Sequence, residues 1–389
     1  MGKSGLAVAT VIVLLMACGP RGAPEAPPAT GPAAAAPAGA QAAAPPAAPP
    51  ASAAASAPPA AAASAPPAPA TVKYAFAPRL PMVPVYIAQE KGYFAEQALD
   101  VDFVPFLAGS NEMLVPMSRG ELDVAAAGLG SGMVNAAADG VMFRMVADQG
   151  QIGHGRSVYN VVVRSDVADK IKTVDDLRGT TGGVAAITAG LSLPYTFFKI
   201  AQAAGLTTPD GLDFANFTFV ETPEGGQADQ LAMFQNKAQD WQLVVEPTPA
   251  LFEDRGLGVR WKKTDEIVRE PIETYTLLYG EHFMVEQPDA AKRFMVAYLK
   301  GLRYFVDNVQ PNAAEINAIA SKYTKVSEAM LERSEWAYYD PNGRVNLRSL
   351  QDQHDFWLAK GLIRKGLGDV SQIVDQSYLD YALAQLGTR

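Results

Sequence analysis

The chain has 389 residues, 49% of them hydrophobic, and its formal net charge is −9. Such a chain can bury a large core, and its acidic balance argues against nucleic acid as a partner. The single cysteine, Cys18, excludes an intramolecular disulfide and a cysteine-rich metal site. The three histidines lack metal-ligand spacing, so the sequence predicts neither a metal centre nor a cofactor.

The first eighteen residues have the pattern of an export signal. Lys3 provides a positive start, an apolar stretch shorter than a membrane span follows, and Leu15-Met16-Ala17-Cys18 ends it. This ending resembles the lipobox of bacterial lipoprotein signals, which implies that Cys18 is lipidated and anchors the protein to a membrane of the cell envelope, outside the cytoplasm. An ordinary secretory signal that happens to contain a cysteine is the alternative.

Residues 19–71 are almost entirely Ala, Pro, Gly and Ser. This composition offers no large apolar side chain to bury and is typical of disordered segments. We therefore expect a disordered tether that holds a folded domain away from the membrane.

From Val72 onward, short apolar strands alternate with amphipathic helices, which predicts an α/β fold with largely parallel sheets. Strands are expected at 72–77, 99–106, 122–127, 142–148, 157–166, 182–186, 217–220, 243–245, 259–262 and 275–279. Helices are expected at 83–89, 111–119 (capped by Ser110), 133–138, 173–179, 190–204 and 227–236, and in a helical C-terminal tail at 289–306, 313–322, 327–336, 347–360 and 378–386.

The βα pattern begins again after a candidate hinge near 150–157. This repetition predicts two Rossmann-like lobes joined by crossing strands. The first lobe would comprise residues 72–158 and 276–389, and the second would comprise residues 159–275.

The loop Pro78–Pro84 connects the first strand to the first helix, at the position where ligands bind in open α/β sheets. Arg79 is its only charge, and its guanidinium is suited to a sulfonate, phosphate or carboxylate. Met82 can pack on an apolar ligand body or fill the core. Both residues are therefore candidate ligand contacts.

Two helix starts supply candidate anion donors. Ser131 lies in the segment GLGSG, which joins a strand to a helix but lacks the spacing of a dinucleotide-binding loop. Thr188 and Ser192 open the long helix of the second lobe, where their hydroxyls and the backbone amides suit an oxyanion. Ordinary helix capping requires the same residue types.

Three further residues complete the candidate ligand-binding set. Glu246 ends a strand before Pro247 and can accept a hydrogen bond from an amine or a heteroaromatic N–H. Asn160 lies near the hinge, and Tyr275 can stack on a ligand. No Ser/His/Asp group or carboxylate pair predicts catalysis, so we do not expect an enzyme.

Four stretches together resemble one family, namely YIAQEKGYFAEQALDVDFVPF, SNEMLVPMSRGELDVAAAGLG, TVDDLRG with the later TAGLSLPYTFFKIAQAAGL, and LVVEPTPALFEDRG. In order and spacing they are similar to type II periplasmic substrate-binding proteins of ABC importers, in the nitrate, sulfonate, taurine and thiamine-precursor branch. The resemblance extends over roughly residues 72–300. It implies a monomeric receptor that binds a small molecule between two lobes and presents it to an ABC permease and its ATPase.

The resemblance leaves the ligand open. A sulfonate-like anion with an organic body suits Arg79 and the helix starts, whereas a neutral or cationic heteroaromatic, such as a thiamine-precursor pyrimidine, suits the apolar loop and Glu246. A ligand-binding subunit of a sensor is a further alternative. The pyrimidine synthases of this branch have a cysteine-rich iron site, which a chain with only Cys18 cannot form.

Overall fold

The computed structural model describes residues 67–106, 112–215, 217–222 and 226–389. The predicted signal with Cys18, nearly all of the predicted tether and the predicted helix cap Ser110 lie outside these ranges. The first strand begins at Ala70 rather than at Val72. Within the described ranges, no helix has both the length and the apolar character needed to cross a membrane.

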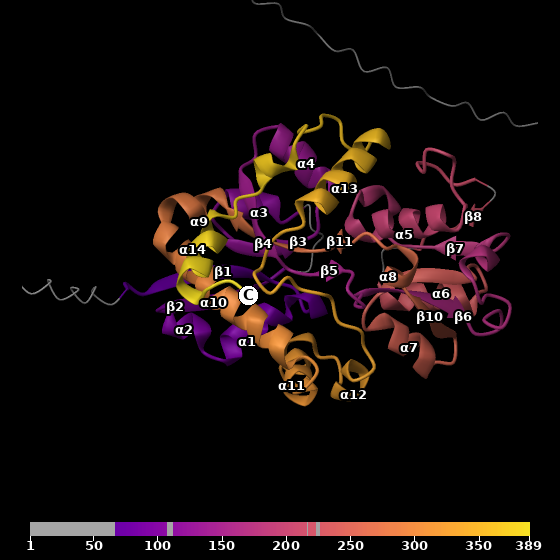
Figure 1. Ribbon diagram of the computed structural model, residues 1–389, viewed down its shortest axis with the longest axis horizontal. Helices are drawn as coiled ribbons and strands as arrows, with labels where there is room; N and C mark the ends of the chain where they lie inside the picture. Colours follow the sequence, from indigo (N-terminus) through magenta and orange to yellow (C-terminus); the bar gives the residue numbers. More distant parts are fainter. Residues whose placement is uncertain (1–66, 107–111, 216, 223–225) are drawn as a thin grey trace, which may run out of the picture. The chain divides into compact units, whose positions relative to one another are not determined.

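The first lobe is built on a five-stranded sheet in the order β2-β1-β3-β12-β4 (Figure 1). Its strands are β1 (Ala70–Phe76), β2 (Leu99–Pro105), β3 (Val124–Ala127), β4 (Phe143–Asp148) and β12 (Thr276–Gly280). β1 is parallel to β2 and β3, whereas β12 is antiparallel to β3 and β4. β12 returns to this sheet after the second lobe, and all of its residues are buried, as a central strand requires.

The first lobe has helices at the places predicted over 83–89, 111–119, 133–138 and 289–306, and three further short helices that the sequence did not predict. They are η1 (Leu80–Met82), α1 (Val83–Glu90), α2 (Tyr93–Glu96), α3 (Leu114–Ser118), α4 (Ser131–Ala138), α9 (Glu281–Glu286) and α10 (Pro288–Asn308). The long helix α10 packs directly on α1. This close approach requires glycine at position 301, because a Cβ atom there would overlap the carbonyl oxygen of Pro84.

The second lobe has its own five-stranded sheet, in the order β10-β6-β9-β7-β8. Its strands are β6 (Tyr159–Arg164), β7 (Thr181–Gly183), β8 (Thr218–Phe219), β9 (Trp241–Val245) and β10 (Gly258–Lys263). Its helices are η2 (Val174–Leu177), η3 (Ile187–Ala189), α5 (Ser192–Ala203), α6 (Gln227–Gln235), α7 (Thr248–Asp254) and α8 (Thr264–Ile267). Phe197 of α5 stacks on Trp241 of β9 at 4.8 Å between ring centroids, a contact type that contributes about 0.5–1.5 kcal/mol.

The two lobes are joined by a short antiparallel pair, β5 (Gln151–Ile152) and β11 (Ile272–Glu273), which confirms the predicted hinge of crossing strands. A third segment crosses beside them. The amide of Gln151 donates to the carbonyl of Tyr338 at 2.8 Å, and the amide of Tyr338 donates back at 3.0 Å. In Figure 1, β5 and β11 lie between the labelled strands of the two lobes.

The C-terminal tail is helical, as predicted, and consists of α11 (Ala313–Thr324), α12 (Glu328–Leu331), α13 (Leu347–Ala359), η4 (Val370–Ile373) and α14 (Ser377–Leu386). The helix predicted over 327–336 is wrong beyond Leu331. Trp336 and Tyr339 are instead buried on Phe305 of α10, and this tertiary packing overrides local helix propensity.

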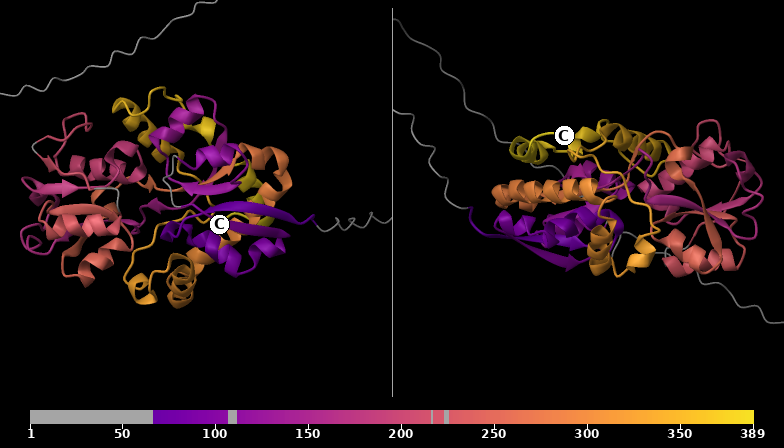
Figure 2. Two further views of the ribbon diagram at one scale, coloured as in Figure 1. Left: turned by 180° about the vertical axis from the view of Figure 1, so that it is seen from behind. Right: turned by 60° about the horizontal axis from the view of Figure 1, so that its bottom comes forward.

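Residues 332–346, which we call the C-terminal strap, run from α12 toward the hinge (Figure 2). The strap also contacts the second lobe, because Arg333 forms an ion pair with Asp254 at 2.8 Å and Glu335 pairs with Lys263 at 3.3 Å. The C-terminal tail therefore contacts both lobes. The predicted lobe boundaries remain a prediction.

Candidate ligand-binding site

A cavity of about 400 Å³ lies between the two lobes, beside the hinge. This volume falls within the range of ~300–1,000 Å³ that is typical of sites for small organic ligands. The first lobe and the tail contribute Pro78, Arg79, Leu80, Gly128, Thr324 and Val326 to the lining. The remaining lining residues are Tyr159, Leu191, Ser192, Leu193, Gly226, Gln227, Gln230, Val245, Glu246, Pro247, Thr248, Thr274 and Tyr275.

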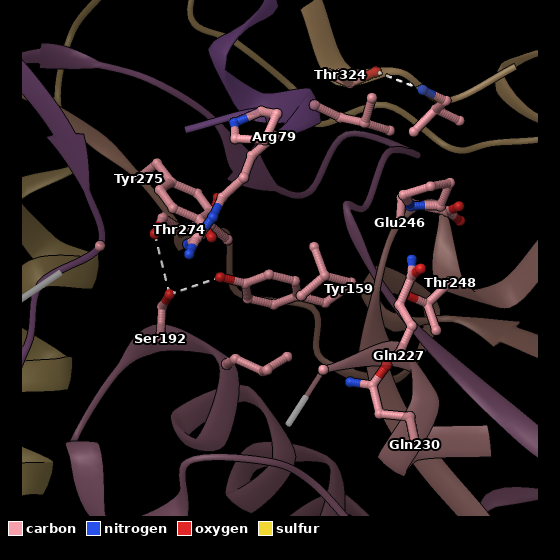
Figure 3. A pocket seen from close by; sticks show the side chains of 18 of the residues that line it. Arg79, Tyr159, Ser192, Gln227, Gln230, Glu246, Thr248, Thr274, Tyr275 and Thr324 are labelled. Atoms are coloured by element: carbon pink, nitrogen blue, oxygen red, sulfur yellow. Dashed lines mark hydrogen bonds between the residues drawn. The ribbon is translucent and has the colours of Figure 1, made fainter. Parts of the chain in front are cut away.

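Arg79 points into the cavity from the loop between β1 and α1 (Figure 3). Hydrogen bonds to the carbonyl groups of this loop fix its path. The Tyr86 hydroxyl donates to the carbonyl of Ala77 at 2.7 Å, and Gln149 and Tyr339 each donate to the carbonyl of Pro81 at 3.0 Å. The first lobe and the strap thus hold the loop while the side chain of Arg79 stays exposed to the cavity.

The guanidinium of Arg79 is a cation without a carboxylate partner among the described residues. The groups that act on it electrostatically are tyrosines, and the nearby Tyr275 raises the pKa of Arg79 above its ordinary value. The side chain therefore stays charged throughout the physiological pH range. A positive charge at this position can pair with an anion.

A chain of hydroxyl groups forms the floor of the cavity. Ser192 Oγ donates to the carbonyl of Thr274 at 3.1 Å and lies 2.9 Å from the Tyr159 hydroxyl, which then donates to it. Because a serine hydroxyl has a single proton, Ser192 has none left for a ligand oxyanion in this arrangement. Its hydroxyl connects α5 to the segment after β11, and a direct donor role toward a ligand would require this bond to break.

Glu246 reaches the cavity with its backbone but not with its carboxylate. The side chain is fully enclosed, and Oε1 accepts from Asn160 Nδ2 at 2.8 Å and from Arg260 Nη1 at 2.6 Å. Burial raises the pKa of Glu246 to about 7, and Arg260 opposes this shift. The carboxylate therefore supports the cavity wall from behind, and it does not present an acceptor to a ligand amine.

Four of the eight predicted ligand-binding residues line the cavity, namely Arg79, Ser192, Glu246 and Tyr275. Met82 is instead buried in the core of the first lobe, and Asn160 is buried behind Glu246.

The other two predicted residues lie at or beside η3. Ser131 joins α4 of the first lobe to the second lobe, because its amide donates to the carbonyl of Gly190 at 3.2 Å and its hydroxyl donates to the carbonyl of Ala189 at 3.1 Å. Thr188 lies within η3, but its side chain is outside the described part of the chain. Direct ligand contact by any of the eight residues remains a prediction.

Among the polar lining residues that sequence reasoning missed, three lie on the far side of the Tyr159 ring from Arg79 (Figure 3). Gln227 and Gln230 lie on α6, and Thr248 opens α7. Thr248 could have been found, because it begins a helix directly after the predicted strand end at Glu246 and Pro247. The two glutamines carry no local signal that separates them from surface residues of an amphipathic helix.

Two five-stranded sheets lie on either side of a hinge, with a cavity between the lobes, and the first sheet receives β12 after the chain has passed through the second lobe. This arrangement defines the two-lobed fold of periplasmic binding proteins. The chain belongs to the NMT1/THI5-like family, whose model matches residues 81–314. This confirms the resemblance that the sequence stretches indicated, and no curated protein matches the chain in sequence.

Solved structures of the same fold include both binding proteins and an enzyme. The periplasmic aliphatic sulphonate binding protein SsuA from Escherichia coli has a TM-score of 0.60 and 14% identity, over 79% of this chain and 93% of that one. The periplasmic nitrate-binding protein NrtA from Synechocystis PCC 6803 has a TM-score of 0.59 and 15% identity, over 82% and 89%. The desulfurization enzyme DSZB has a TM-score of 0.59 and 14% identity, over 81% and 99%. At such identities the likeness concerns the fold alone.

Proposed function

We propose that this protein is the substrate-binding component of an ABC import system and that it captures a small organic anion between its two lobes. The observation that carries this proposal is Arg79, a charged side chain that has no counter-ion in the part of the chain that the structure describes and that points into a cavity between two hinged lobes. A ligand that contacts both lobes would stabilise the closed form, which is the form that a permease can recognise.

The size and lining of the cavity favour an organic anion over a small inorganic one. A nitrate-sized ion would pair with Arg79 but leave most of the 400 Å³ unfilled. Leucine and valine side chains line much of the remaining wall, and such surfaces gain free energy when an apolar ligand body covers them. A ligand with a sulfonate or carboxylate head and an organic body can pair with Arg79 and also cover the apolar wall.

A cationic heteroaromatic ligand has less support. That hypothesis depended on the carboxylate of Glu246 as an acceptor, and this carboxylate is enclosed and paired with Arg260. The cavity then presents one positive charge and no available negative charge among its described lining residues. A cationic ligand would be repelled by Arg79 without compensation.

Binding is better supported than catalysis, although DSZB demonstrates that this fold can carry an enzyme. The described lining contains no histidine or cysteine. Ser192 directs its proton to a backbone carbonyl and accepts from Tyr159, so no base is placed to activate it. The proposal also retains the lipid anchor on Cys18, an extracytoplasmic location, a monomeric state, and the ABC permease and ATPase as partners.

Arg79→Ala tests the proposal directly. Alkanesulfonates, alkyl carboxylates, nitrate and aminopyrimidines are screened by thermal shift, because selective binding to the folded state raises the apparent stability, and hits are measured by calorimetry. We expect an organic anion to bind and Arg79→Ala to weaken it by ~1.5–3 kcal/mol, the range for a hydrogen bond to a charged group. Arg119→Ala, which changes an exposed arginine of the first lobe, is the control and should bind normally. Unchanged affinity in Arg79→Ala, or selective binding of aminopyrimidines, would contradict the proposal.

A further inference from the structure

We propose that Asp148 and Glu273 form a proton-dependent lock at the hinge, in which one shared proton holds the crossing segments together and its loss allows the lobes to open. The inference concerns the hinge and does not depend on which ligand the cavity takes, so it goes beyond the proposed function. It makes pH a regulator of the balance between the open and closed forms.

The two carboxyl groups lie where the three crossing segments meet. Asp148 is the last residue of β4, directly before the first crossing, and Glu273 belongs to the crossing strand β11, where it pairs with Gln151 of β5. The strap donates to both side chains, because the amide of Asp340 bonds to Asp148 Oδ2 at 2.7 Å and the amide of Asn346 bonds to Glu273 Oε2 at 2.8 Å. Each carboxyl group therefore links its own crossing segment to the strap.

The arrangement of donors leaves a place for one proton between the two side chains. Asp148 and Glu273 are hydrogen-bonded to each other, which requires a proton because two ionised carboxylates can only accept. Both oxygens of Asp148 already accept from backbone amides, those of Gly150 and Asp340. Glu273 Oε1 is enclosed and has no donor among the described residues. A proton on this oxygen donates to Asp148 and supplies the missing hydrogen bond.

No cation in the described part of the chain pairs with the two carboxyl groups. The titratable groups that face them are the carboxyl group of Asp340 and the hydroxyl groups of Tyr298, Tyr338 and Tyr339. The side chains of α13 that bond to the backbone of Glu273 are uncharged. Without the shared proton, two buried negative charges would lie in contact, which is costly. Burial accordingly raises the pKa of Asp148 to about 7.

Loss of the proton favours opening because the described structure has the lobes in direct contact. The amide of Ser131 in the first lobe donates to the carbonyl of Gly190 in the second lobe at 3.2 Å. In this closed form the carboxyl groups touch, whereas bending at the hinge moves their crossing segments apart and lets water reach the charges. The closed form therefore holds the proton more tightly than the open form, and rising pH favours opening.

The test measures the distance between the lobes in the full chain without any ligand. Spin labels are attached to two exposed positions, through Arg119→Cys in the first lobe and Asp169→Cys in the loop after β6 of the second lobe. Cys18→Ser removes the native cysteine. Pulsed electron paramagnetic resonance then gives the distance distribution as a function of pH. We expect a single distance near pH 5.5 and a second, open population whose ratio to the closed one rises above pH 7 by up to about tenfold per pH unit, since one proton is involved.

Glu273→Gln separates the lock from other titrating groups. The substitution places an amide nitrogen where the proton is held, so the hydrogen bond to Asp148 no longer depends on pH. We expect this variant to keep the closed distance up to about pH 8.5, the upper end of a titration in which the charge of an ordinary carboxylate does not change. Glu286→Gln, at an exposed position of α9, is the matched control and should open with pH as the unmodified chain does.

Two outcomes would overturn the inference. If the distance distribution of the chain with Glu273 intact does not change with pH, the hinge has no proton-dependent lock, and this result needs no further variant. If the distribution still changes with pH in Glu273→Gln, another group such as Glu246 is responsible. Neither outcome affects the proposed function, because no ligand is present and the loop with Arg79 is unchanged.

Discussion

The two walls of the cavity are built in different ways. The wall of the first lobe is a short proline-containing loop that presents one exposed charge, Arg79, and is held through its backbone carbonyls by Gln149 and Tyr339. The wall of the second lobe combines neutral side chains from helix starts with Tyr159 of β6 and Val245 of β9. Its charged groups, Glu246 and Arg260, are paired behind the surface. One wall thus provides attraction for an anion, and the other provides shape and hydrogen bonds.

This difference indicates which change would destabilise each wall most. The second wall depends on a buried ion pair, so its weak point is the loss of one partner. The support of the first wall is continuous with Asp148 and the hinge, and its weak point is the loss of a proton from the buried carboxyl groups there. The predictions below change one wall at a time.

The largest expected effect is the loss of the ion pair behind the second wall. Glu246→Ala leaves Arg260 largely buried without its main counter-charge, and such losses typically reduce the free energy of unfolding by ~3–5 kcal/mol. Glu253→Ala is the matched control, because Glu253 lies 3.8 Å from the same guanidinium and is more exposed. It should lower the free energy of unfolding by less than ~1 kcal/mol. Urea denaturation measures both, and equal effects would contradict a special role for Glu246.

The second prediction concerns two buried carboxyl groups beside the first wall, Asp148 and Glu273. No cation among the described residues pairs with them, and the backbone amides of Gly150, Asp340 and Asn346 donate to their oxygens. Burial raises the pKa of Asp148 to about 7 and raises the pKa of Glu273 well above its ordinary value. We therefore expect the two side chains to hold a shared proton in the folded protein.

Because the folded state holds this proton more tightly than the unfolded state, the stability that the two groups contribute is fully present below about pH 4, the ordinary pKa of a carboxyl group, and is lost as the pH rises through the folded-state pKa of about 7. For one proton the slope is roughly 1.4 kcal/mol per pH unit. Glu273→Gln replaces the shared proton with a permanent donor and should flatten the decline between pH 5 and 7, although Glu246 retains a slope of the same sign. Glu121→Gln, at an exposed site, is the control. A pH profile that Glu273→Gln does not change would contradict the shared proton.

The third prediction compares the two ends of the hydroxyl chain in the cavity floor. Ser192→Ala removes the donor to the carbonyl of Thr274 and leaves the buried Tyr159 hydroxyl without its acceptor, which should cost ~1–3 kcal/mol of unfolding free energy. Tyr159→Phe leaves the bond to Thr274 in place and should cost about 1 kcal/mol. The reverse order in thermal denaturation would mean that Ser192 donates to Tyr159 instead.

The smallest expected effect is at the C-terminal strap. Arg333 and Asp254 form an ion pair between half-exposed side chains, and pairs of this kind contribute ~0–1 kcal/mol. Arg333→Ala should therefore change the melting temperature little and should leave ligand binding intact. A large loss of affinity would mean that the strap takes part in closure.

Much of the fold could be predicted because its signals are local. The alternation of strands and helices follows hydrophobic periodicity, and the glycine and proline residues mark where elements end. The strap could not be predicted, because Trp336 and Tyr339 are buried by Phe305, a residue about thirty positions earlier, and not by their own neighbours.

The site was predictable only in part for the same reason. Arg79 follows the first strand directly, and the position of a loop at a strand end is a local property. Whether Ser192 and Glu246 are free to meet a ligand is decided by Thr274, Asn160 and Arg260, which lie on other elements. Sequence can place a polar side chain near a cavity, but the availability of its proton or its lone pair depends on partners that only the folded chain brings together.

The pairing of Tyr338 with Gln151 adds a third backbone connection beside β5 and β11. Three neighbouring crossing segments oppose sliding and twisting of one lobe relative to the other more than they oppose bending at the hinge. Opening would then proceed as a rotation about one line through the crossings, and the loop with Arg79 and the starts of α6 and α7 would separate along a reproducible arc.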